Sequence, residues 1–123
     1  MDPGSQDRGS VTAETAVALP ALVAVVVVLL AGLSAGVDQL RCVDAARVAA
    51  RALARGEDPA RAAAAAQAAA PPGAGVSVRA QGDLVQVVVT ARARTWPGAA
   101  ARAGPTLRGE AVAWREPGWG GGR

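Results

Sequence analysis

The chain has 123 residues, of which 51% are apolar, and its net charge is only +3. With one cysteine and no histidine it lacks the usual ligand sets of a zinc site and cannot form an intrachain disulfide. All 13 basic residues are arginine, a bias that GC-rich genomes encode together with abundant alanine, glycine and proline. The arginine content therefore does not indicate nucleic-acid binding, and we expect no nucleic-acid partner.

The apolar residues are mostly alanine and valine. Phenylalanine and tyrosine are absent, and tryptophan occurs three times. Aromatic side chains bury the most area per residue, so the sequence predicts a thin core that neighbouring proteins stabilise. The single cysteine, Cys42, is either a small packing residue, which we favour, or half of an intermolecular bridge in an oxidising compartment.

A long uncharged run occupies the first third of the chain. Thr15 to Val37 contain no charged residue, and 23 residues at about 1.5 Å each make a helix of roughly 34 Å, enough to cross a hydrocarbon core of about 30 Å. The sequence predicts a transmembrane helix over residues 10–37. Pro20 lies one turn into the run and is predicted to kink the helix, because proline removes one helical N–H.

A cleaved secretory signal is an alternative interpretation of the same run. Such a signal has a basic amino-terminal flank and an apolar stretch of about 7 to 15 residues. Here the run is longer, and the flank carries Arg8 against Asp2 and Asp7. The alternative product would be a secreted soluble protein without the span.

The charges around the run predict an orientation. Arg41, Arg47, Arg51 and Arg55 follow it, whereas Arg8 and the amino terminus precede it. The positive-inside rule alone therefore places the C-terminal part in the cytoplasm.

Helical periodicity continues beyond the run, over residues 38–70. An apolar stripe at spacings of three and four predicts a face that packs on other elements; its members are Leu40, Val43, Ala46, Ala50 and Leu53. Arg47, Arg51 and Arg55 recur every four residues on another face, which either is solvated or meets anionic lipid or an acidic partner. Asp44 lies three residues before Arg47, a spacing that allows an ion pair.

A helix end and a new helix start follow. Gly56 is typical of a stop, Asp58 can cap the next helix, and Pro59 suits its first turn. The alanine-rich segment that follows is predicted to run to Ala70 and to end before Pro71.

The period then changes to that of strands. Residues 71–116 are predicted to form a small antiparallel β region, with alternating apolar residues from Val76 to Ala80, a turn at 81–83, and a valine-rich strand from Leu84 to Ala91. Leu107 to Trp114 form the third predicted strand. Residues 117–123 are predicted to be a flexible tail. The predicted class is α+β, a long helix packed against a sheet of about three strands.

No catalytic constellation is present in the sequence. It has no histidine, no nucleophile motif, no phosphate-binding glycine loop and no paired carboxylates with an evident cleft. We therefore expect no enzyme activity, no cofactor and no metal site.

The stretch "DRGSVTAETAVALPAL" resembles the amino terminus of TadE-like proteins, the minor pilins or pseudopilins of tight-adherence (Flp-type) pilus systems. In that family a short hydrophilic leader ends in glycine, a glutamate is the fifth residue after the cut, and an apolar helix with an early proline follows. Gly9, Glu14 and Pro20 match these places, whereas Thr15 stands where many relatives have phenylalanine or tyrosine. The resemblance implies that residues 1–9 are a leader, which a prepilin peptidase cuts between Gly9 and Ser10.

The resemblance also implies a function. The mature protein would be a single-pass membrane protein with a cytoplasmic amino terminus and an extracytoplasmic C-terminal domain, in contact with membrane lipid, other pilins and inner-membrane assembly proteins. This orientation conflicts with the positive-inside count, and we let the cleavage motif outweigh it. The alternative, from another class, is an uncleaved membrane anchor that displays a small binding domain on the envelope.

Glu14 has a physical role under the family interpretation. Cleavage would expose an ammonium group on Ser10, one helical turn from the Glu14 carboxylate, which could neutralise the amine of its own or a neighbouring subunit. Glu14 is then an assembly residue. In the alternative interpretation it is a helix-start residue favoured by the helix dipole.

Overall fold

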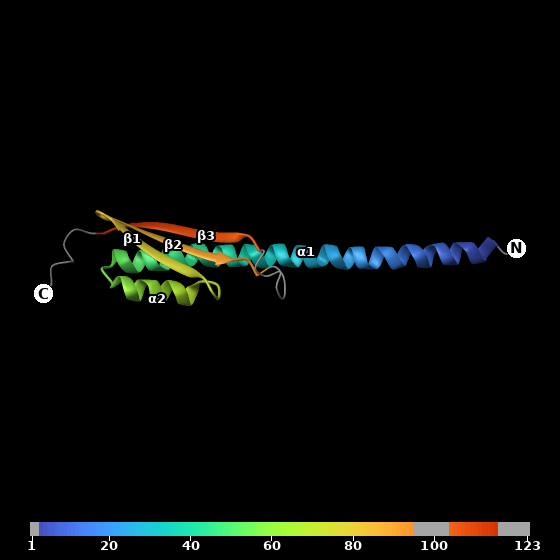
Figure 1. Ribbon diagram of the computed structural model, residues 1–123, viewed down its shortest axis with the longest axis horizontal. Helices are drawn as coiled ribbons and strands as arrows, with labels where there is room; N and C mark the ends of the chain where they lie inside the picture. The colour runs from blue at the N-terminus through green and yellow to red at the C-terminus, as the bar shows by residue number, and fades with distance from the viewer. Residues whose placement is uncertain (1–2, 95–103, 116–123) are drawn as a thin grey trace. The chain divides into compact units, whose positions relative to one another are not determined.

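The computed structural model describes residues 3–94 and 104–115, which form helices and an antiparallel sheet (Figure 1). The chain divides into two compact units, Met1–Leu33 and Ser34–Arg123. The α+β class and the three-stranded sheet are confirmed; the predicted tail, at residues 117–123, lies outside the described residues. The elements are α1 (Pro3–Ala54), α2 (Pro59–Ala69), β1 (Gly75–Gln81), β2 (Leu84–Arg92) and β3 (Thr106–Trp114).

In the first unit, α1 exposes a run of large apolar side chains. The valines and leucines from Val11 to Leu33 are between 42% and 73% exposed. By length and composition α1 could cross a membrane. It continues without interruption through Pro20, and the predicted kink there stays a prediction. The predicted boundaries after residues 9 and 37 also fall inside this one helix.

The end of α1 shows why Gly56 is a stop. The Gly56 N–H donates to the Leu53 carbonyl at 3.0 Å, and the Glu57 N–H donates to the Ala52 carbonyl at 3.1 Å. These two bonds form a Schellman motif, in which the first residue after the helix C-cap adopts a left-handed backbone conformation. Here that residue is Gly56. Gly56 has φ of 80°, which glycine adopts without steric cost.

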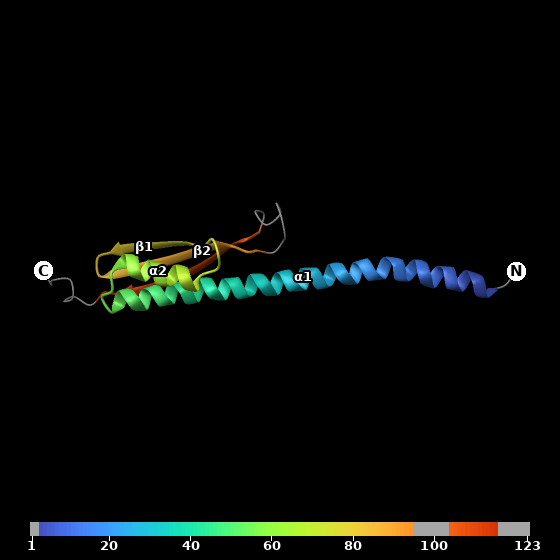
Figure 2. The same cartoon turned by 90° about the horizontal axis from the view of Figure 1, so that it is seen from below.

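The second helix begins with Pro59 in its first turn, as predicted, and it runs back along α1 (Figures 1 and 2). Asp58 occupies the N-cap position with extended backbone, but its side chain makes no capping hydrogen bond. The helix ends at Ala69, before Pro71, close to the predicted end. Its last turn is tied to the next segment by the Gln67 side-chain amide, which donates to the Ala74 carbonyl at 2.7 Å.

The sheet has the order β1-β2-β3, with both pairs antiparallel. A two-residue turn, Gly82 and Asp83, joins β1 to β2, so that Gln81 pairs with Leu84. Gly82 has φ of 62° while Asp83 has negative φ, which matches a type II′ turn with glycine in its first central position. The predicted strands are confirmed to within two residues.

The core lies between one face of the sheet and the two helices of the second unit. It is built mostly from alanine on the helices and valine on β2, and its sheet side includes Val85, Val87 and Val89. The predicted stripe is right at Ala46, Ala50 and Leu53 but wrong at Leu40, which is 70% exposed. The buried face of α1 is rotated toward smaller residues, because a close approach of helix and sheet leaves no room for larger ones. Its buried members are Cys42, Ala45, Ala46, Ala49, Ala50, Ala52 and Leu53.

Candidate functional site

The predicted processing and assembly residues all lie on α1. Gly9, Ser10 and Glu14 are exposed, and Ser10 and Glu14 are four residues apart on a continuous helix, so they share one face. Glu14 is the only charged residue between Arg8 and Asp38. Within the described residues, Glu14 forms no ion pair, so its carboxylate is available to a group outside this part of the chain.

Two threonines beside Glu14 have their hydroxyl groups satisfied by the helix itself. Thr12 Oγ1 donates to the Arg8 carbonyl at 2.9 Å, and Thr15 Oγ1 donates to the Val11 carbonyl at 2.8 Å. A hydroxyl bonded to the preceding turn costs little in an apolar environment, since no donor is left unpaired. Thr15 stands where many TadE-like proteins have an aromatic residue. Its side chain lacks the ring, but its bonded hydroxyl is compatible with an apolar environment.

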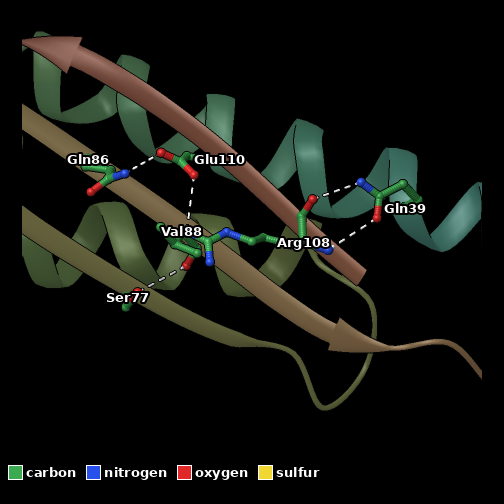
Figure 3. Close-up of polar contacts among 6 residues, drawn as sticks. All are labelled: Gln39, Ser77, Gln86, Val88, Arg108 and Glu110. Carbon is green, nitrogen blue, oxygen red and sulfur yellow. Dashed lines mark hydrogen bonds and ion pairs between the residues drawn. The ribbon is translucent and has the colours of Figure 1, made fainter. Parts of the chain in front are cut away.

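In the second unit, α1 and β3 are joined by a side-chain amide (Figure 3). Gln39 Nε2 donates to the Arg108 carbonyl at 2.8 Å, and the Arg108 N–H donates to Gln39 Oε1 at 3.2 Å. This amide makes the same pair of bonds that a neighbouring strand would make. It satisfies the backbone groups of Arg108 at the free edge of β3. It also fixes the position of β3 along α1.

Next to this pair, β3 passes directly against the backbone of α1. Gly109 is buried, and a Cβ placed on it would overlap the carbonyl group of Cys42. Cys42 is fully buried. Burial raises the pKa of its thiol, and the nearby Asp38 carboxylate raises it further. The packing interpretation of Cys42 is confirmed, because a fully buried thiol cannot reach another chain without local unfolding.

The outer face of the sheet carries a small polar network (Figure 3). Gln86 Nε2 donates to Glu110 Oε1, and Arg108 Nη2 donates to Glu110 Oε2 at 3.2 Å. These bonds, first that of Gln86 and then that of Arg108, lower the pKa of Glu110. Ser77 Oγ lies 3.5 Å from the Val88 carbonyl oxygen on the same face. The network is exposed and joins β2 to β3.

The ion pairs formed by the arginines of α1 differ from the pair that the sequence predicts. The ion pairs of the described residues join Arg41 to Asp38 at 3.9 Å and Arg55 to Glu57 at 2.7 Å, besides the pair on β3. The expected pair between Asp44 and Arg47 is absent from this part of the chain. An exposed pair at this spacing gains only about 0.2–0.5 kcal/mol, which does not hold two solvated side chains together.

The structure thus keeps the predicted site residues on one helix and shows features that the sequence analysis missed. These features are the Gln39 link, the close approach at Gly109 and the polar network on the outer face of the sheet. A glycine inside a strand is a known signal of close backbone approach, so Gly109 could have been found. The residues that the structure describes hold no cluster of side chains suited to a metal ion.

Comparison with known proteins finds one relative of note. The protein named "Apoptosis inhibitor Rv3655c" from Mycobacterium tuberculosis is 45% identical to this chain over 84 residues, which are 68% of this chain and 66% of the relative. The aligned part therefore covers just under two thirds of the relative's length. No family model matches the chain. No solved structure matches it significantly.

Proposed function

We propose that this protein is a TadE-like minor pilin or pseudopilin, a single-pass membrane protein that takes part in the assembly of a tight-adherence pilus. The observation that carries the proposal is the placement of Gly9, Glu14 and Pro20 at the start of a long helix with exposed apolar side chains. The name of the mycobacterial relative says nothing of pili, so the proposal depends on this motif and not on the comparisons.

The first step is processing of the leader. A prepilin peptidase cuts after Gly9, which removes residues 1–9 and leaves an ammonium group on Ser10. Gly9 suits this role because it is exposed and a Cβ placed there would meet no atom within 4 Å beyond the adjoining helix backbone.

The second step is association with other subunits. A carboxylate in a membrane helix costs about 2.5–3.5 kcal/mol at the bilayer centre, so Glu14 gains from a cationic partner. Its own Ser10 amine or that of a neighbouring pilin supplies one. Since Glu14 is the only charge between Arg8 and Asp38, pairing at this residue sets the axial register of the apolar helices.

The proposed topology places Ser10 at the cytoplasmic side and the unit from Ser34 outside the cytoplasm. It sets aside the positive-inside rule, which is statistical, in favour of a specific cleavage motif. The proposed partners are the prepilin peptidase, other pilins, inner-membrane assembly proteins and membrane lipid, without nucleic acid or cofactor.

The experiment that tests the proposal reads the amino terminus of the protein by mass spectrometry from membranes of the native cell. We expect a chain beginning at Ser10 in the wild type and an intact chain in Gly9→Val. Gly4→Val is the matched control, because Gly4 is exposed in the same leader and lies away from the cut. Glu14→Ala should be cut normally but should fail to co-purify with other pilins.

Two results would overturn the proposal. If Met1 stays attached in cells whose pilus system is active, the chain is an uncleaved anchor that displays a small envelope domain. If the protein is cut after the apolar run, it is a secreted protein without a span.

The mycobacterial relative favours a second candidate function. Its name describes inhibition of apoptosis, and 45% identity over 84 residues makes the same activity a candidate for this chain. The test adds the full chain in detergent-free nanodiscs to cultured cells under an apoptotic stimulus and measures caspase activity. A fall relative to empty nanodiscs supports this candidate, and unchanged activity excludes it.

A further inference from the structure

The edge of β3 that faces away from β2 is open over its second half. Beyond the two ends of β3, the Pro105 carbonyl accepts from Ala93 and the Arg115 N–H donates to Asp83, so these residues bond toward the β2 side. Backbone groups alternate along a strand, and the even-numbered residues of β3 therefore point to the opposite edge. The bonds between Arg108 and Gln39 agree with this alternation.

Gln39 satisfies only the first part of this edge. The N–H and C=O groups of Glu110, Val112 and Trp114 point the same way as those of Arg108, and they have no partner in the described chain. Val112 is 56% exposed and Trp114 is 72% exposed. An edge with exposed apolar side chains is a template for another strand. β3 contains no proline, lysine or bulge, and its two charged residues, Arg108 and Glu110, pair with each other on the outer face.

A groove lies beside the same edge. It has a volume of about 240 Å³ and is lined by Ala111, Val112 and Ala113 of β3, and by Arg47, Ala50, Arg51 and Ala54 of α1. The small side chains leave space between strand and helix. Arg47 and Arg51 are exposed and form no ion pair within the described chain. Two unpaired guanidinium groups therefore flank the space into which alternate side chains of an added strand would point.

We propose that the edge from Glu110 to Trp114 binds an extended acidic segment of a partner protein by strand addition. The partner's backbone pairs with the open groups of Val112 and its neighbours. Its inward side chains occupy the groove, where acidic ones pair with Arg47 and Arg51 and small apolar ones contact Ala50 and Ala54. Main-chain bonds give such complexes affinity, and the pockets for alternate side chains give them specificity.

A second copy of this chain is a poorer occupant. A twofold pairing of β3 with itself would double every charge of the interface, because the same patch serves both subunits. Four guanidinium groups, two from Arg47 and two from Arg51, would then line one contact, while both Glu110 carboxylates are already bonded to Gln86 and Arg108. The inference depends on the second unit alone and stands apart from the proposed pilin function.

The test measures peptide binding by the full chain in detergent micelles, using fluorescence anisotropy. The probes are a labelled seven-residue peptide of alternating valine and aspartate and the same peptide with lysine for aspartate. We expect the aspartate peptide to bind at least about tenfold more tightly, the ratio that 1.4 kcal/mol of charge pairing produces. Arg47→Glu with Arg51→Glu should reverse the preference. Arg61→Glu with Arg79→Glu, an equal charge change at exposed residues of α2 and β1, should leave it unchanged.

Val112→Pro tests the backbone part of the proposal. Proline removes an N–H that points to the open edge and leaves the β2 ladder intact, so binding of the aspartate peptide should be lost. In the wild type the peptide should also slow hydrogen exchange of the Val112 amide, a result that does not depend on any variant. Equal binding of both peptides, no binding, or no protection of Val112 overturns the proposal. A wild-type dimer that Val112→Pro makes monomeric also overturns it, because the occupant is then a second copy.

Discussion

The two units of this chain place the apolar side chains of α1 in opposite environments. From Val11 to Leu33 the large side chains, valine and leucine, are exposed. From Cys42 to Leu53 the helix buries mainly alanines against the sheet, and Leu40, just before them, is exposed. Helix geometry is continuous across both stretches, so local propensity does not distinguish them.

The difference shows where each stretch finds its stability. A large exposed apolar surface has to be covered by lipid or by another protein, because water hydrates it poorly. The alanine face gains less from burial but allows the sheet to approach until β3 touches the α1 backbone at Gly109. The stability of the exposed stretch therefore depends on the lipid or protein that surrounds it, whereas the stability of the alanine face depends on its close packing against the sheet.

The largest effect should come from charging the exposed apolar stretch. Each arginine at the centre of a membrane helix costs about 2.5–3.5 kcal/mol, so Val25→Arg with Leu29→Arg should remove most of the protein from the membrane fraction. Ala60→Arg with Ala64→Arg, at exposed residues of α2, is the matched control and should stay in the membrane. Carbonate extraction followed by immunoblotting measures the partition. Membrane retention of the first pair would show that lipid does not cover this stretch.

Gly109→Ala should give the next largest effect, since its Cβ would overlap the Cys42 carbonyl group. Overpacking costs typically 1–3 kcal/mol, and we expect about 3 kcal/mol here because the obstacle is backbone. The measurement is the urea midpoint of the full chain in detergent micelles. Gly75→Ala is the control; its Cβ would lie 3.3 Å from Thr90 Oγ1, a side-chain atom that can move. Equal midpoints for the two variants would contradict the close fit.

Removing the Gln39 link should have a smaller effect. Gln39→Ala breaks two hydrogen bonds to Arg108, each worth about 0.5–1.5 kcal/mol net. We expect faster hydrogen exchange of the Arg108 amide and a modest fall in stability. Gln67→Ala, which breaks the bond to Ala74 instead, should leave Arg108 exchange unchanged. Unchanged Arg108 exchange in Gln39→Ala would show that water replaces the amide without loss.

The smallest effect should come from the polar network on the outer face. The pKa of Glu110 is lowered in the folded protein, so its contribution is present above the ordinary glutamate pKa and is lost as pH falls through the folded-state value. Thermal melting from pH 7 down to pH 3 should show a slightly larger fall in the wild type than in Glu110→Gln. Parallel melting curves for the two proteins would mean that the network does not contribute.

Much of the fold follows from the sequence because its signals are local. Gly56 and Pro59 punctuate the helices, and the change from helical to alternating periodicity marks the sheet. Leu40 is wrongly placed because periodicity defines a face only to within one residue, and packing distance chooses the smaller side chains. Gln39 gives no local signal, since its partner is 69 residues away in the chain.

The candidate site divides in the same way. The motif from Gly9 to Pro20 is contiguous, so the sequence alone exposes it, and its role in processing and assembly stays a prediction. The open edge of β3 needs knowledge of strand order, side-chain burial and the position of α1. A linear pattern such as Arg47 and Arg51 indicates a charged face but does not identify the strand beside it.

We propose, as the centre of this account, that the exposed stretch of α1 spans the membrane and that the second unit folds outside the cytoplasm. The most direct measurement labels Ala60→Cys, in a Cys42→Ala background, with a membrane-impermeant maleimide on intact cells. Ala60 is exposed on α2, so we expect labelling without lysis. Labelling only after lysis would place the second unit in the cytoplasm, in agreement with the arginine count and against the pilin topology.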